Sequence, residues 1–234
     1  MKLFELTTRY NDELNPKLWD GEKLRPEVLA KLKDVAEHFL KFLKVKNVKI
    51  EDIVMTGSLA NYNWTEKSDI DIHLIADVKD TGVTCKDITQ ELFDAKKDLW
   101  ADKYDITIKG FPIEMYVQDK DEPHPVAMGV YSLNKNKWLE KPKYSPPKIN
   151  PDEVVAQAKK LGQEIKKVVG SEASSKEAKA VKDEIKKVRE KGLHSDKGEF
   201  STGNLAFKEL RNTGMLGRLM DFIKDEESDE LSLK

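Results

Sequence analysis

One predicted strand with two aspartates constrains this chain more than any other feature. Residues 69–75 read Asp-Ile-Asp-Ile-His-Leu-Ile and alternate polar with apolar side chains in period two. This period predicts a β-strand with one buried face. Side chains two residues apart on a strand project from the same face, roughly 6.5 Å apart, so Asp69 and Asp71 would present their carboxylates side by side.

Two adjacent carboxylates repel each other, and a shared proton or a divalent cation relieves the repulsion. Oxygen ligands favour Mg²⁺ completed by water and substrate phosphates. Upstream, the apolar run Ile53–Thr56 predicts a buried strand that stops at Gly57. We expect a turn or a helix start there; at the positive end of a helix, backbone amides and the Ser58 hydroxyl would meet a phosphate. The sequence therefore predicts adjoining metal and phosphate sites.

A third acid at the same end of the sheet would complete a two-metal site, in which ions about 4 Å apart hold the attacking and leaving oxygens. Glu114 is the best candidate, because it stands inside the otherwise apolar run 113–117. A charge that protects an edge strand explains it as well. Asp105 competes, although exposure at a strand end accounts for it. His73, in phase with the aspartates, is expected to be a hydrogen-bonding neighbour rather than a ligand.

The remaining elements of the first 145 residues mix helices with strands. Hydrophobic periodicity predicts helices over 26–44 and 87–102. Two short runs, 104–108 and 112–117, suggest a hairpin. The second helix is predicted to carry Ile88, Leu92, Ala95 and Leu99 on one stripe. The predicted order is helix, strand, strand, helix, hairpin.

The composition changes between Gln118 and Pro151, where six prolines leave room only for a short hairpin. We expect the domain boundary there, with one domain over residues 1–145 and a second over 146–234. Beyond it, periodicity predicts helices over 152–169 and 174–191 and a last helix that contains residues 205–222. The C-terminal domain is therefore predicted to be small and helical.

Composition excludes several classes of protein. The chain has 41 Lys and Arg against 43 Asp and Glu, so net charge alone gives no reason to expect a nucleic-acid partner. No run approaches the roughly 18 apolar residues of a membrane span, and Glu5 stands where a secretory signal would be apolar. We expect a cytoplasmic protein without a membrane partner. The single cysteine, Cys85, cannot form an internal disulfide and is expected to be a free thiol.

The residues of the predicted metal and phosphate sites resemble the signature of the nucleotidyltransferase superfamily typified by DNA polymerase β. Its signature is an apolar residue, Gly, then Gly or Ser, a gap of about ten, and Asp-apolar-Asp, with a third carboxylate on a later strand. The chain has Thr56-Gly57-Ser58, ten residues, Asp69-Ile70-Asp71, and later Glu114. The resemblance spans residues 26–120. The segments 68–74 and 129–132 also look like small nucleotidyltransferase-like proteins of tailed phages.

The resemblance implies an α+β nucleotidyltransferase core, a mixed sheet flanked by helices. It also implies two Mg²⁺ ions, for which Mn²⁺ can substitute, on Asp69, Asp71 and Glu114, and a nucleoside triphosphate on Gly57 and Ser58. The implied reaction transfers a nucleoside monophosphate to an acceptor hydroxyl and releases pyrophosphate. For a phage-encoded protein, the location would be the cytoplasm of the host cell.

The acceptor is predicted to be an RNA 3′ end, such as that of a tRNA. Residues 151–191 hold eleven Lys and Arg against eight Asp and Glu, a modest excess that a solvated helix face explains as well. Lys208 and Arg211 are expected to reach the triphosphate across a cleft between the domains. Two alternatives stay open: a non-catalytic nucleotide- or protein-binding module on the same fold, and an antitoxin-like transferase that modifies a protein. The oligomeric state is left open.

Overall fold

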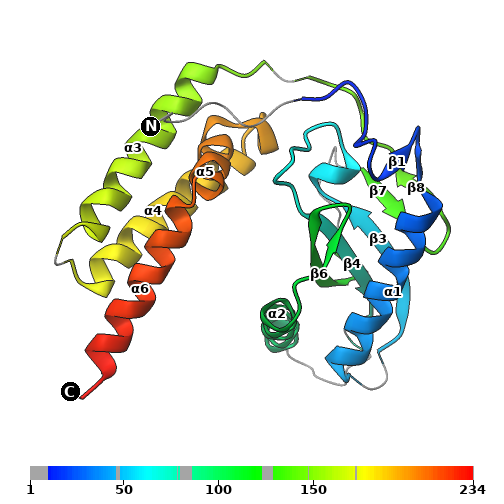
Figure 1. Cartoon of the computed structure of the whole chain (residues 1–234), viewed down its shortest axis with the longest axis horizontal. Coiled ribbons are helices and arrows are strands. Elements are labelled where there is room, and N and C mark those ends of the chain that lie inside the picture. The colour runs from blue at the N-terminus through cyan, green and yellow to red at the C-terminus, as the bar shows by residue number, and fades with distance from the viewer. Residues whose placement is uncertain are drawn as a thin grey trace. The chain divides into compact units, whose positions relative to one another are not determined.

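The computed structural model describes residues 10–45, 48–77, 79, 86–122, 129–146, 148–171 and 173–233. Cys85 and Glu5, each with a prediction above, lie outside the described residues. The chain divides into two compact units, one ending at Ser145 and one running on from Pro146 (Figure 1).

The first unit is built on a six-stranded sheet with the strand order β5-β6-β4-β3-β7-β8. Its strands are β3 Ile50–Thr56, β4 Ile70–Ala76, β5 Thr107–Ile108, β6 Phe111–Asp119, β7 Val130–Ser132 and β8 Lys137–Glu140. The strands β4 and β6 run parallel, whereas the other neighbours are antiparallel. The sheet is therefore mixed, as expected. A short ladder joins β1 Trp19–Asp20 to β2 Lys23–Leu24.

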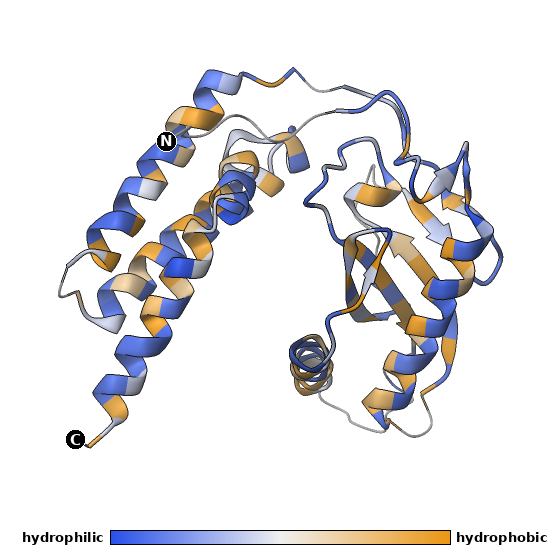
Figure 2. Ribbon diagram, viewed as in Figure 1, coloured by the Kyte–Doolittle hydropathy of each residue, from blue (hydrophilic) through white to orange (hydrophobic). Residues whose placement is uncertain are grey.

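Helices flank this sheet. The helix α1, Pro26–Leu43, begins with a proline in its first turn, where a missing N–H costs nothing, and ends at Lys44 in the left-handed conformation. Both hydrophobic and hydrophilic residues lie along it, as in an amphipathic helix (Figure 2). Parallel strands need a crossover connection, and α2, Lys86–Lys103, lies in the connection between β4 and β6. Both helices were predicted within two residues of these bounds.

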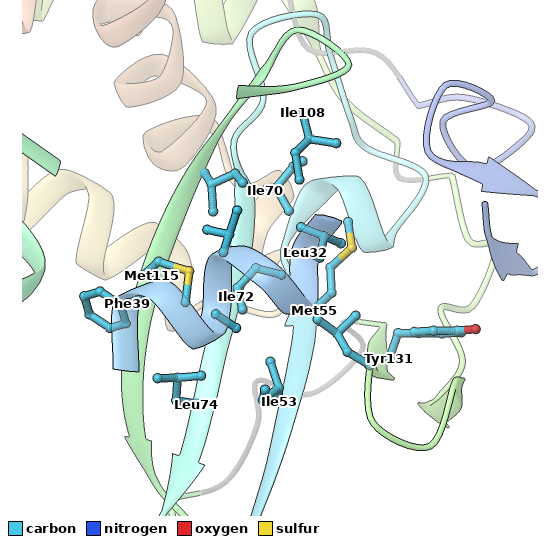
Figure 3. Packing of buried hydrophobic residues seen from close by; sticks show 14 of the residues in the cluster. Leu32, Phe39, Ile53, Met55, Ile70, Ile72, Leu74, Ile108, Met115 and Tyr131 are labelled. Atoms are coloured by element: carbon cyan, nitrogen blue, oxygen red, sulfur yellow. The ribbon is translucent and has the colours of Figure 1, made fainter. Parts of the chain in front are cut away.

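The main core lies between α1 and the sheet. Leu32 and Phe39 of α1 pack with Ile72, Leu74 and Met115 of the central strands (Figure 3). These side chains are almost completely buried, and burying each one stabilises the fold by about 1.5–3 kcal/mol. Because side chains alternate along a strand, this packing leaves the intervening residues of β4 and β6 on the opposite face.

The predicted apolar stripe of α2 does not face the core. Three of its four residues are largely exposed: Ile88 by 59%, Leu92 by 47% and Leu99 by 58%. The helix instead buries Phe93 and Trp100, and the Trp100 ring packs edge-on against Phe39 with 5.3 Å between centroids. Aromatic side chains bury about 150–250 Å² each, more than the aliphatic residues of the stripe. The larger rings therefore set the rotation of the helix.

The second unit is a bundle of helices. They are α3 Pro151–Val169, α4 Ser175–Leu193, α5 Thr202–Asn212 and α6 Met215–Leu231. Leu161, Ile185, Leu210 and Leu219 meet in its core, one from each helix. The Ser174 hydroxyl and the Glu177 carboxylate form a capping box at the start of α4.

The predicted last helix is two helices, because the chain turns at Gly214, which has a φ of 72°. This left-handed conformation ends α5 and is inexpensive for glycine. None of the helices in the described ranges is long and apolar enough to cross a membrane.

Candidate functional site

The two aspartates of the alternating segment lie at the start of β4. Asp71 is the second residue of the strand and Asp69 directly precedes it. Ile70 and Ile72, on the other side of the strand, are completely buried in the core. The aspartates are both half-buried on the opposite face. The hydrophobic alternation of β4 therefore determines which face carries the carboxylates.

Glu114 lies beside Asp71 on the neighbouring strand. In the parallel register of β4 and β6, Asp71 is paired with Glu114. Paired residues project from the same face of a sheet, and adjacent strands are about 4.8 Å apart. Asp105, the competing acid, is exposed ahead of β5. Of the two candidates for the third acid, the structure brings Glu114 next to Asp71.

Tyr116 adds a proton donor to these three acids. It follows Glu114 by two residues on the same face of β6, and its hydroxyl donates a hydrogen bond to the Glu114 carboxylate. Burial raises the pKa of Tyr116 far above its ordinary value, and the bond to Glu114 and the charges of Glu114, Asp71 and Asp69 raise it further. The phenol therefore stays protonated. Sequence reasoning missed this residue, although the period of the strand places it in phase with Glu114.

Further groups surround the Tyr116 ring. His73, paired with Tyr116 across β4 and β6, stacks on it with 4.7 Å between ring centroids. The His73 Nδ1 atom is hydrogen-bonded to Oε1 of Gln118 at 2.8 Å, which agrees with the expected hydrogen-bonding role of this histidine. The Lys97 ammonium of α2 lies 4.5 Å from the centroid of the Tyr116 ring. These contacts fix the ring beside Glu114.

Gly57 directly follows β3 and lies against Asp71. Its φ is 76°, and a Cβ atom at this position would lie 1.8 Å from Oδ2 of Asp71. No other residue lets the backbone turn so close to this carboxylate. The register of β3 and β4 agrees with this contact, because Thr56, the residue before Gly57, is paired with Asp71.

The turn or helix start expected after Gly57 is a single 3₁₀ turn, Ser58–Ala60. The chain becomes extended again at Asn61 and returns to β4, so an α-helix has no room to develop. Three residues carry almost no macrodipole, and the expected positive helix end is therefore wrong. The Ser58 hydroxyl donates to Oγ of Ser68 at 2.8 Å, which joins the two ends of the loop.

Carboxylate oxygens, such as those of Asp71 and Glu114, are the ligands that hard divalent cations prefer. Asp71 and Glu114 are paired neighbours, and the missing side chain of Gly57 leaves room for the Asp71 carboxylate. In the part of the chain that the structure describes, no three acidic, His or Cys side chains are placed so that together they could hold a metal ion. Glu114 is instead hydrogen-bonded to Tyr116.

Lys208 and Arg211, the expected triphosphate ligands, both lie on α5 of the helical unit. The Lys208 ammonium forms an ion pair with the Glu199 carboxylate at 2.8 Å. Arg211 is exposed. Their contribution to nucleotide binding stays a prediction.

Residues 36–141 match the family described as nucleotidyltransferase domain. The matched range includes Gly57, Asp69, Asp71 and Glu114. No curated protein matches the chain.

Two solved structures match this chain over most of its length. One is the STING-associated CdnE c-di-GMP synthase from Capnocytophaga granulosa, at 13% identity, with 88% of this chain and 84% of that chain covered and a TM-score of 0.24. The other is the CdnE c-UMP-AMP synthase from Rhodothermus marinus with Apcpp and Upnpp, at 12% identity, with 91% and 95% covered and a TM-score of 0.27.

Proposed function

We propose that residues 36–141, which match the nucleotidyltransferase-domain family, form a nucleotidyltransferase and that Asp69, Asp71 and Glu114 are the acids of its active site. In this proposal the enzyme transfers a nucleoside monophosphate from a nucleoside triphosphate to an acceptor hydroxyl. One observation carries the proposal. The register of β4 and β6 pairs Asp71 with Glu114, on the face that the apolar residues of both strands leave free of core packing.

Each acid has a defined task. Asp69 and Asp71 would hold the divalent ions, and Glu114 would complete the site and accept the proton of the acceptor hydroxyl. When bound, Mg²⁺ or Mn²⁺ neutralises charge on the triphosphate and lowers the pKa of the acceptor hydroxyl. The acceptor oxygen forms a bond to the α-phosphorus while the bond from that phosphorus to the bridging oxygen breaks. Pyrophosphate leaves with the electron pair of the broken bond.

The turn after β3 supplies the phosphate contacts. Gly57 is buried against Asp71 and Ser58 beside it is half-buried, so a phosphate bound at this turn would lie beside the acids. The Ser58 hydroxyl has one proton, and in the structure it donates this proton in the hydrogen bond to Ser68. Ser58 therefore has to exchange Ser68 for the triphosphate, or bind it through its backbone amide.

Tyr116 is a positioning residue in this scheme. Its un-ionised hydroxyl donates to Glu114 and fixes the orientation of the carboxylate that receives the proton. His73 stacks on the ring and Lys97 lies against it, so the phenol has little freedom to turn away. This arrangement resembles the outer-shell hydrogen bonds that orient ligands at metal sites.

We propose an RNA 3′ end, for example that of a tRNA, as the acceptor. Six lysines that support this choice are exposed on α3 and α4: Lys159, Lys160, Lys166, Lys167, Lys186 and Lys187. Ammonium groups on a helix surface can follow a phosphate backbone. Two of the six have intrahelical acidic partners, Lys167 with Glu164 at 2.8 Å and Lys186 with Glu190 at 3.8 Å. The net attraction is therefore modest and would be sensitive to salt.

Transfer of a labelled nucleotide tests the reaction and the acceptor together. The full chain is incubated with Mg²⁺ and each α-³²P-labelled nucleoside triphosphate, with and without total tRNA. We expect label in RNA, its loss in Asp71→Asn and its retention in the exposed-acid control Asp105→Asn. Label in protein instead of RNA would show that the acceptor is a protein. Equal labelling by the wild type and Asp71→Asn would contradict the assigned acids.

A further inference from the structure

The exposed side of α2 carries a second apolar surface that the fold does not use. Its members are Ile88, Leu92, Ala95 and Leu99, defined here as the α2 stripe. They are spaced by four, three and four residues, and all four are exposed. The opposite side of the same helix already supplies Phe93 and Trp100 to the core. The stripe is therefore additional to what folding requires, and a contiguous exposed apolar patch commonly marks an interaction site.

The spacing of the stripe is that of a coiled-coil seam. Alternating steps of four and three residues match the d and a positions of a heptad, with Leu92 and Leu99 at a. Over this length the drift between a straight helix and a strict heptad is only about 20° per heptad. Two such helices can therefore pack side by side along the whole stripe without marked supercoiling.

The charges beside the stripe indicate which helix would pack there. Glu91 and Asp98 occupy the g positions on one side, and Lys96 and Lys103 occupy the e positions on the other. In a parallel pair, a g residue meets the e residue five positions further along the partner helix. A second copy of α2 would thus place Glu91 opposite Lys96 of the partner subunit and Asp98 opposite Lys103 of the partner subunit. Two-fold symmetry would form each of these pairs twice.

An antiparallel arrangement lacks this match. It would place g beside g and e beside e, so acids would face acids and lysines would face lysines. Like charges held close together destabilise an interface. The charge pattern therefore distinguishes the two orientations, although the apolar stripe alone does not.

We propose that the protein forms a homodimer in which the α2 stripes of two copies pack in parallel. The proposal is independent of the proposed catalytic residues, because none of the stripe residues belongs to them. A single pair of short helices is a small interface, so we expect a dissociation constant on the order of micromolar.

Sedimentation equilibrium of the full chain at about 1–200 µM, a range that spans micromolar dissociation, tests the dimer. The wild type is expected to shift from monomer to dimer across this range. Leu92→Glu is expected to remain monomeric. The control is Leu139→Glu, which alters a comparably exposed leucine (42%) on β8 and should dimerise like the wild type. Unchanged circular dichroism and thermal midpoint would show that both variants are folded. A wild type that stays monomeric, or a Leu92→Glu variant that dimerises normally, would overturn the proposal.

Charge reversal tests the parallel orientation. Asp98→Lys alone and Lys103→Glu alone should each weaken the dimer, because each places like charges across a parallel seam. The double variant restores opposite charges there and should recover dimerisation. Across an antiparallel seam the double variant still sets like charge against like charge. Failure of the double variant to recover, with both singles folded and weakened, would overturn the parallel arrangement.

Discussion

Gly57 and Asp71 are in such close contact that a Cβ atom on the glycine would lie 1.8 Å from the aspartate Oδ2 atom. The contact joins the turn after β3 to the first carboxylate of β4. It thus places the proposed phosphate contact and the proposed metal ligand next to each other. It also explains in physical terms why a Gly-Ser pair precedes Asp-x-Asp in this chain, since a side chain at residue 57 would displace the carboxylate.

Gly57→Ala should therefore impair both stability and chemistry. An alanine at a φ of 76° costs about 1–2 kcal/mol, and the clash with Asp71 adds to this cost. Gly110→Ala is the matched control, because its φ is 89° but nothing lies within 4 Å of a Cβ there. Urea unfolding should show a loss in both variants, and nucleotidyl transfer should fall only in Gly57→Ala. Equal activity of the two variants would contradict a role for the contact in catalysis.

Tyr116→Phe should reduce transfer without unfolding the protein. The variant keeps the ring that stacks on His73 but removes the hydroxyl that donates to Glu114. Loss of a hydrogen bond that orients a ligand typically costs about 10–100-fold in activity or metal affinity. Steady-state kinetics should show a lower kcat with little change in KM for the nucleotide. Tyr104→Phe, a half-buried tyrosine beside α1, is the control and should leave both constants unchanged. A Tyr116→Phe enzyme with wild-type kcat would refute the positioning role.

Substitutions of two neighbouring residues of α2 should differ sharply in their effect on the free energy of unfolding. Phe93 is 2% exposed and Leu92 is 47% exposed. Phe93→Ala should cost about 3–5 kcal/mol in the free energy of unfolding, because it leaves a cavity in the core. Leu92→Ala should cost less than about 1 kcal/mol when measured at concentrations too low for dimerisation. Urea denaturation of the two variants compares them directly, and a larger loss for Leu92→Ala would reverse the assigned orientation of the helix.

Local patterns were sufficient to predict most of the fold. The period of β4 correctly placed Asp71 and His73 on the face opposite Ile72, and the helices α1 and α2 begin and end within two residues of their predicted bounds. The direction in which the apolar stripe of α2 faces was not predicted, because heptad spacing alone does not reveal which of two apolar faces packs inward. That choice depends on the volume available beside β6 and on the size of Phe93 and Trp100.

The site was predictable to the extent that it depends on strand period and spacing. Glu114 could be selected from its apolar surroundings, but its pairing with Asp71 depends on the register of a parallel pair far apart in sequence. The 3₁₀ turn at Ser58 and the bond from Tyr116 to Glu114 are tertiary features that no local pattern encodes. The lysines of the helical unit illustrate the same limit, because their charge was visible in the sequence but their ion pairs were not.

Divalent-cation binding tests the central assignment most directly, because it requires neither the acceptor nor turnover. Mn²⁺ is titrated into the full chain with a non-hydrolysable nucleoside triphosphate analogue present, and free Mn²⁺ is followed by electron paramagnetic resonance. Asp69→Asn, Asp71→Asn and Glu114→Gln should each weaken binding by at least about tenfold, equivalent to ~1.4 kcal/mol, whereas Asp105→Asn should bind like the wild type. Wild-type affinity in all four variants would contradict the assignment of these three acids as the metal ligands of the enzyme.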